Sequence, residues 1–370
     1  MSKKFPFYQY LHRQVHLGFL LATSTLLLTT IPTFTELPGG KSLAQTQDGI
    51  VSQDLDAAML FQMGVTRYQR QEYQEAESAF RQALRRDPGI GIARKYLGNI
   101  LMEQNSFELA VQEYTEAIRI NPNVAELYYN LGLALQKQDK QEEAITAYRK
   151  ALSMNPRMAI AHYNLGLALY EQELRDEAIA AYQEAINLDP KNVNAFLNLA
   201  VVLQQEGQIE TAISNYRQVI ALDPENTLAY NNLGALLIIQ DQPKEAIEIY
   251  QQAINKNPKN AVAYYNLGVI LYNQGELKLA NQILKRASKE YNAQGNTEQA
   301  AKIDEITQKI SQDLEPKPEP KKDPTVTEIS PTEIAPATIP TNENDTDMNN
   351  NGDVILPPPE TAAPINSTEK

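Results

Sequence analysis

The side chains best suited to chemistry in this chain are amides that recur at one fixed interval. Asparagines stand 34 residues apart at five consecutive places, which are Asn130, Asn164, Asn198, Asn232 and Asn266. An asparagine side chain carries both a hydrogen-bond donor group and an acceptor, so it can pair with both polar groups of a peptide unit. This chemistry suits recognition of a polypeptide better than covalent catalysis.

Residues suited to catalysis or metal binding are scarce. The chain has no cysteine, and of its three histidines only His162 lies beyond residue 16. These counts exclude disulfides, thiol nucleophiles and thiolate metal sites, and they leave too few histidines for a zinc centre. Carboxylate pairs such as Glu142-Glu143 are typical of solvated helix charge, and no glycine-rich phosphate loop is present. We therefore expect no enzymatic activity, no metal and no cofactor.

The elements that position the asparagines follow from a period of 34 residues. Small residues, rings and prolines all repeat at this interval. The prolines, each preceded by Asp or Asn, are Pro88, Pro122, Pro156, Pro190, Pro224 and Pro258. The small residues are Gly64, Gly98, Gly132, Gly166, Ala200, Gly234 and Gly268. The large side chains are Phe80, Tyr114, Tyr148, Tyr182, Tyr216, Tyr250 and Leu284.

These spacings predict two amphipathic helices in each period, because apolar residues recur three or four apart. The small residue lets the two backbones approach, and the large side chain fills the remaining space. Asp-Pro or Asn-Pro ends the second helix, whereas Pro243 falls where a second helix begins and proline fits. Numbering each period from its first residue gives repeats at 57–90, 91–124, 125–158, 159–192, 193–226, 227–260 and 261–294.

The chain resembles the tetratricopeptide repeat family over about residues 57–294, through NLG in the first helix, EAI–Y–A in the second and the final DP. The resemblance implies an all-α, right-handed superhelical solenoid of seven helical hairpins, with the first helices lining an inner groove. A lone hairpin cannot bury enough apolar area, so each hairpin packs on its neighbours. The last hairpin then needs a covering helix with a polar outer face, which we call the lid. Residues 295–314 fit a capping helix, with Ala300, Ile303, Ile306 and Ile310 on one face.

In this family the sixth place of each repeat faces the groove, and five of the seven sixth places are the asparagines above. The set is similar to the array of O-linked N-acetylglucosamine transferases, in which the equivalent ladder binds the backbone of extended peptides. The catalytic domain of those enzymes has no counterpart here. The alternative is that these asparagines tie neighbouring repeats together.

Five neutral hydrogen bonds of about 1 kcal/mol each fall short of the roughly 8 kcal/mol that micromolar binding needs. Apolar anchors are therefore expected. The tyrosine candidates at the fifth and twelfth places of the first helices are Tyr129, Tyr163, Tyr265, Tyr170 and Tyr272, and Phe61 and Leu197 also occupy the fifth place. Lys95 and Asn99, with Asn130, match three of the five positions of the family's carboxylate clamp, but Ile160 and Asn164 stand where its other two cations belong.

The N-terminal 44 residues are expected to be a signal peptide or a membrane anchor. Lys3, Lys4 and Arg13 precede a twelve-residue apolar core at 17–28, and Ser42-Leu43-Ala44 fits a cleavage site. The alternative is an uncleaved anchor over residues 15–34. Cleavage would export the chain to the periplasm or an equivalent lumen, and residues 45–56 would then be a linker.

Residues 315–370 are expected to be a disordered tail, because they hold eleven prolines, eleven acidic residues and no aromatic residue. The net charge of −13 argues against nucleic acid and against an anionic membrane surface as partners. The sequence thus predicts an exported scaffold or adaptor that binds a protein or peptide. The alternatives are a peptide-binding chaperone or assembly factor for envelope or photosynthetic-type complexes, and a passive, membrane-anchored envelope component.

Overall fold

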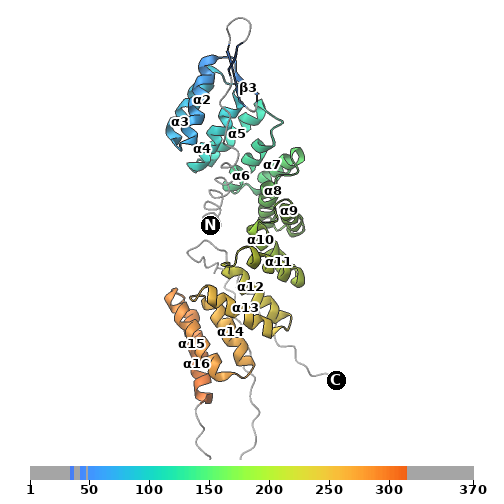
Figure 1. Ribbon diagram of the computed structural model, residues 1–370, viewed down its shortest axis with the longest axis vertical. Coiled ribbons are helices and arrows are strands. Elements are labelled where there is room, and N and C mark those ends of the chain that lie inside the picture. Colours follow the sequence, from blue (N-terminus) through green and yellow to red (C-terminus); the bar gives the residue numbers. More distant parts are fainter. Residues whose placement is uncertain (1–33, 37–41, 47–48, 315–370) are drawn as a thin grey trace, which may run out of the picture. The chain divides into compact units, whose positions relative to one another are not determined.

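The computed structural model of this protein describes residues 34–36, 42–46 and 49–314 (Figure 1). The predicted apolar core of the leader and the predicted tail lie outside these residues. Among the described helices, none combines the length and the apolar character that crossing a membrane requires. The chain divides into two compact units, Met1–Ala195 and Phe196–Lys370, and each is described separately.

The first unit contains four helical hairpins, coloured blue to green in Figure 1. Each pair consists of two antiparallel helices that contact one another. The pairs are α2 (Leu55–Gln69) with α3 (Tyr73–Arg86), α4 (Gly91–Glu103) with α5 (Phe107–Ile120), α6 (Ala125–Lys137) with α7 (Gln141–Met154), and α8 (Ala159–Glu171) with α9 (Arg175–Leu188).

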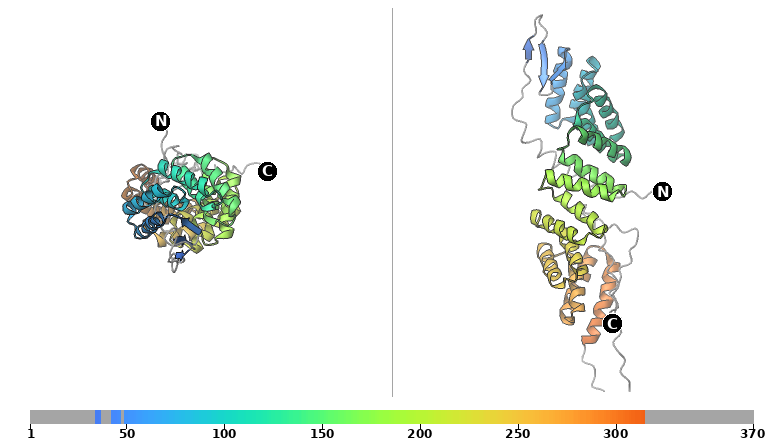
Figure 2. Two further views of the ribbon diagram at one scale, coloured as in Figure 1. Left: turned by 90° about the horizontal axis from the view of Figure 1, so that it is seen from above. Right: turned by 90° about the vertical axis from the view of Figure 1, so that its right-hand side faces the viewer.

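The helices that follow are α10 (Val193–Gln205), which begins just before the second unit, α11 (Ile209–Leu222), α12 (Thr227–Ile239), α13 (Pro243–Lys256), α14 (Ala261–Asn273), α15 (Leu277–Ala293) and α16 (Thr297–Leu314). Helix α12 packs against α13, and α14 packs against α15. The two pairs meet through α13 and α14, and Figure 2 shows them in yellow to orange. Each predicted 34-residue window therefore holds two helices, which confirms the array of helical hairpins.

The helix ends fall where the prolines predict. Each second helix before a periodic proline stops two residues ahead of it, as α7 does at Met154 before Pro156 and α9 at Leu188 before Pro190. Pro243 occupies the first turn of α13, where its missing N–H has no intrahelical partner to lose.

The predicted close approach of small residue and ring is also confirmed. A Cβ atom added to Gly132 would lie 2.6 Å from Cε1 of Tyr148, and one added to Gly166 would lie 2.7 Å from Tyr182. Both rings are fully buried. The glycines thus create the space that the tyrosines fill.

The lid forms as expected. Helix α16 lies beside α15 (Figure 1), and it buries Ala300, Ile303 and Ile310 completely or nearly so. Ile306 is half-buried in the same apolar cluster. The opposite face of α16 is polar, so the helix closes the apolar core at the end of the repeat array.

The prediction of a linker over residues 45–56 needs correction. Strands β1 (Phe34–Glu36), β2 (Ser42–Thr46) and β3 (Gly49–Ser52) form an antiparallel sheet, and α2 already begins at Leu55. Ser52 then joins the sheet to the first hairpin by donating to Asp87 Oδ2 at 2.5 Å.

Candidate functional site

Successive first helices touch one another within the first unit, since α4 contacts α6 and α6 contacts α8. This arrangement brings the fifth-place residue of one repeat next to the sixth-place residue of the following repeat. We call the surface of α6 and α8 that carries Tyr129, Ile160, Tyr163 and Tyr170 the first-helix face. It holds the predicted anchors of repeats three and four.

The amide of Asn164 is used inside the fold. The side chain is only 2% exposed, and its Nδ2 donates to the hydroxyl of Tyr129 at 3.1 Å and to the carbonyl oxygen of Ile160 at 3.0 Å. Burial raises the pKa of Tyr129, and the bond from Asn164 acts in the opposite direction. Asn164 therefore satisfies a buried hydroxyl of the preceding repeat.

Other members of the asparagine ladder make equivalent connections. Asn130, 4% exposed, points Nδ2 at Asn99 Oδ1, which also accepts from the Tyr114 hydroxyl at 2.7 Å. In the second unit, Nδ2 of Asn232, 5% exposed, donates to the Tyr216 hydroxyl at 3.1 Å.

The remaining two ladder positions, Asn198 and Asn266, are half-buried. Asn266 hydrogen-bonds Tyr250, again a ring of the preceding repeat. The prediction of an exposed ladder is thus corrected for Asn130, Asn164 and Asn232, because an amide that is buried and bonded to its neighbour does not present its polar groups to a peptide. The alternative, in which the asparagines tie repeats together, fits these three residues.

The tyrosines of the first-helix face are held in fixed positions. The Tyr129 ring lies 6.0 Å from that of Tyr148, and the Tyr163 ring lies 6.1 Å from that of Tyr182. Tyr129, Tyr163 and Tyr170 are half-buried, so each keeps part of its ring at the surface. Beside them Ile160 is 48% exposed. The surface is therefore apolar and already ordered.

The predicted anchors of the last repeat lie in a different setting. Tyr265 is 8% exposed and belongs to the cluster beneath α16, together with Leu284 and Ile303. Tyr272 packs against the same cluster. The prediction of Tyr265 as an exposed anchor is corrected, because the lid helix covers this end of the array.

The residues of the suggested carboxylate clamp are paired within the fold. Lys95 Nζ lies 3.1 Å from Glu126 Oε2 and 5.5 Å from the ring centroid of Tyr96. Asn99 holds the Tyr114 hydroxyl, and Asn130 contacts Asn99. The three residues come together, but a carboxylate ligand would have to displace Glu126.

A polar cluster that was not predicted from the sequence lies at the ends of α6 and α8, and it includes Lys137, Gln141 and Glu171. Glu171 accepts a hydrogen bond from Gln141 Nε2. Burial, and secondly the charge of Asp139, raise the pKa of Glu171 to about 7. Burial also lowers the pKa of Lys137, although the negative charge of Glu171 acts to raise it. The signal was available, because Lys137 and Glu171 stand 34 residues apart at the same repeat position.

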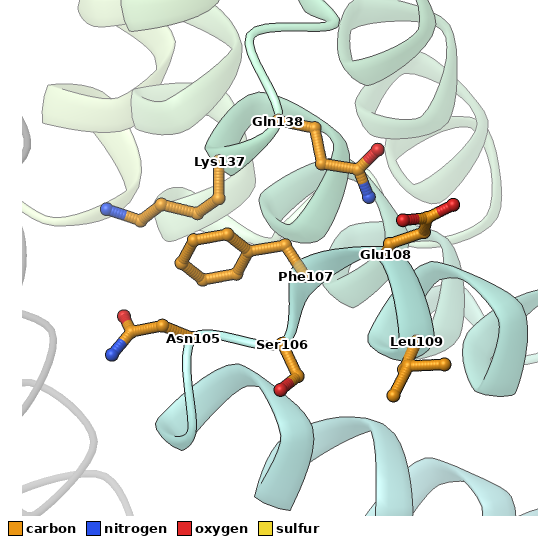
Figure 3. A pocket seen from close by; sticks show the side chains of 7 residues that line it. All are labelled: Asn105, Ser106, Phe107, Glu108, Leu109, Lys137 and Gln138. Carbon is orange, nitrogen blue, oxygen red and sulfur yellow. The ribbon is translucent and has the colours of Figure 1, made fainter.

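A shallow pocket of about 530 Å³ lies where α5 begins and α6 ends (Figure 3). Figure 3 shows the Phe107 ring between Lys137 and Ser106, with Gln138 and Glu108 at one side. None of the predicted site residues lines it. Within the described ranges no group of three or more His, Cys, Asp or Glu side chains could hold a metal ion.

Comparisons with known proteins give a consistent result. Sequence models described as TPR repeat or tetratricopeptide repeat match residues 57–90, 98–139, 129–193, 181–214, 204–241 and 237–301. A search among curated proteins found no significant match.

Among solved structures, the C-terminal part of a TPR repeat-containing protein from Cytophaga hutchinsonii is 15% identical, with a TM-score of 0.58 over 66% of this chain and 98% of that one. YrrB, described as a TPR protein with an unusual peptide-binding site, is 25% identical, with a TM-score of 0.46 over 50% of this chain and 95% of its own. MamA is 26% identical, with a TM-score of 0.42 over 44% and 96%. The sequence matches, with the repeated helical hairpins, show that this chain belongs to the tetratricopeptide repeat family.

Proposed function

We propose that this protein is an interaction scaffold that binds a partner protein through the first-helix face and recognises the partner's side chains. One observation supports this most strongly. The amides of Asn130 and Asn164 turn into the fold, while Ile160 is 48% exposed and Tyr163 and Tyr170 are only half-buried.

The chemistry of the face favours an apolar segment of the partner. Tyrosine rings are effective interface anchors, because they bury a large area at a low cost in side-chain entropy. Here the rings of Tyr129 and Tyr163 already pack on buried rings, so little further ordering accompanies binding. Glu126 stands on α6 at the same repeat place as Ile160, and its side chain is 50% exposed, so it favours a basic group of the partner beside the apolar one.

The first alternative is a chaperone or assembly factor that reads the backbone of unfolded segments. It would require Asn164 to release the Tyr129 hydroxyl in exchange for a peptide group. The second alternative is a passive component held by an uncleaved N-terminal anchor. We propose that the protein is not an enzyme, since the face offers no nucleophile with a base.

We further propose that the protein acts outside the cytoplasm, in a periplasm or an equivalent lumen. This rests on the charge and apolar pattern of residues 1–44. The intact mass of the protein from its native cell tests it. A chain that starts at Gln45 supports export with cleavage, while a chain that keeps residues 15–34 supports the anchored alternative.

The binding face is tested by capture of partners from the native cell with two matched variants. Ile160 is 48% exposed on α8 and Leu279 is 44% exposed on α15, a second helix, so both accept a charge without unfolding the chain. We expect Ile160→Glu to lose the captured partner and Leu279→Glu to retain it. Equal capture by both variants would remove the first-helix face as the binding surface.

A further inference from the structure

The first helix of the array carries an apolar stripe at the surface. Leu55, Met59 and Met63 of α2 are spaced four residues apart, so they lie on one side of the helix. They are 43%, 51% and 44% exposed, although β2 and β3 also contact α2. Three large apolar side chains in a row are unusual on a polar helix surface.

The same places are covered in the repeats that follow. Met59 and Met63 stand at the third and seventh places of the first repeat. The third-place residues of the later repeats, all at most 3% exposed, are Ala93, Leu127, Ala161, Ala195, Ala229 and Ala263. At the seventh place Leu131 is half-buried, and the others, at most 8% exposed, are Leu97, Leu165, Leu199, Leu233 and Leu267.

A second helix of the preceding repeat provides this cover, as α5 does for α6 and α7 does for α8. Within the part of the chain that the structure describes, no helix precedes α2. Its third place also holds methionine, where five of the six later repeats have alanine. Leu127 shows that a large side chain at this place can also be covered, since it is 3% exposed on α6, which α5 contacts.

The two ends of α2 carry opposite charges beside the stripe, so two antiparallel copies of the helix match in charge. Asp54 and Asp56 at the start of α2 share Arg86, at 3.8 and 2.8 Å, which leaves this end acidic. Arg70, exposed, follows the end of the helix. When two copies of α2 lie antiparallel, the acidic start of each faces the basic end of the other, as a two-fold contact requires.

The other end of the array does not offer an apolar match. The outer face of α16 is polar, with Glu298, Glu305, Gln308 and Lys309 all exposed. Head-to-tail stacking of α16 on α2 would bury charges against Met59 and Met63. A second copy of α2 is therefore the occupant that fits best.

We propose that α2 is a self-association surface, on which two copies of this chain pack their α2 helices antiparallel through Leu55, Met59 and Met63. A stable dimer buries about 800 Å² on each partner, and one helix stripe offers less. The dimer is therefore reversible and depends on concentration. It leaves the first-helix face open, so it is independent of the proposed function.

The absence of cysteine from the chain makes a cross-linking test clean. In the full-length chain, Met63→Cys should be joined to a second copy by a short thiol cross-linker, at a yield that rises with protein concentration. Leu279→Cys, equally exposed at 44%, is the control and should give at least tenfold less. Sedimentation equilibrium should show a wild-type dimer that Met59→Glu weakens at least tenfold.

Charge reversal tests the antiparallel arrangement. Arg70→Glu and Asp56→Lys should each dimerise poorly alone, whereas an equimolar mixture of the two should form heterodimers, because each contact then pairs opposite charges. The proposal is overturned if the wild type stays monomeric while the thiol introduced by Met63→Cys reacts freely. It is equally overturned if that thiol is protected in a monomer, which would mean that the chain covers its own stripe, or if the control cross-links as well.

Discussion

Replacement of Asn164 by alanine separates the two roles that an asparagine can have at this place. The amide donates to the Tyr129 hydroxyl at 3.1 Å and to the Ile160 carbonyl oxygen at 3.0 Å, and the side chain is 2% exposed. If it ties the repeats together, Asn164→Ala must destabilise the fold. If it reads peptide backbones, the variant loses binding and keeps its stability.

The magnitude follows from the lost contacts. A buried polar group that loses its partner costs about 1–3 kcal/mol, and the Tyr129 hydroxyl is such a group. The higher helix propensity of alanine offsets at most about 0.7 kcal/mol of this loss of stability. We therefore expect the free energy of unfolding to fall by about 1–2 kcal/mol.

Urea unfolding followed by far-UV circular dichroism measures this loss. Repeat arrays need not unfold in one step, so the curves are fitted with a nearest-neighbour treatment of the repeats. Asn187→Ala is the control, since Asn187 is exposed and its Nδ2 donates to the exposed Glu184 at 3.3 Å. It should not lose stability beyond a few tenths of a kcal/mol, and alanine can add up to about 0.7 kcal/mol of helix propensity there.

A double-mutant cycle with Tyr129→Phe isolates the hydrogen bond between the two side chains. The double variant should be more stable than the sum of the two single losses predicts, by about 1 kcal/mol, because neither polar group is then left alone. If Asn164→Ala behaves like Asn187→Ala and the cycle shows no coupling, Asn164 does not tie the two repeats together.

Three further predictions concern the packing, the polar cluster and the lid. Gly132→Ala should lower the free energy of unfolding in urea by about 1–3 kcal/mol, because its Cβ would lie 2.6 Å from the Tyr148 ring and the gain in helix propensity is only about 1 kcal/mol. A more stable variant would contradict this packing. The pKa of Glu171 is raised from 4.5 to about 7, so its stabilising effect is complete below pH 4.5 and is lost as the pH rises through 7. Glu171→Gln should therefore gain stability relative to wild type across this range, and a constant difference would count against the shift. Ile303→Asp places an unpaired charge in the apolar cluster beneath α16 and should speed amide exchange in α15 and α16 first, whereas unchanged exchange there would show that the lid is dispensable.

The fold was largely predictable because its determinants are local and repeated seven times. The prolines predict where the second helices end. The glycines of the first helices predict where the rings of the second helices pack. The turn inside each hairpin was less visible. It requires a positive φ at one place in every repeat, but residues such as Gln71, Asp139 and Glu173 occupy that place in addition to glycine. Only the surrounding helices impose this conformation.

The site was less predictable because the direction of a side chain depends on the neighbouring repeat. The repeat pattern places an asparagine at the sixth place of five first helices, but whether Asn164 turns outward depends on a hydroxyl 35 residues earlier in the chain. Tyr163 and Tyr265 stand at equivalent places, yet the lid buries only the latter. The sheet over residues 34–52 lacked a repeat from which to infer it.

Recognition of side chains instead of backbone by the first-helix face can be measured by calorimetric titration with a partner segment and with the same residues in scrambled order. We expect at least a tenfold weaker affinity for the scrambled peptide, and loss of binding to the native segment in Ile160→Glu. Equal affinities for the two peptides, abolished by Asn164→Ala in a protein of unchanged stability, would contradict it.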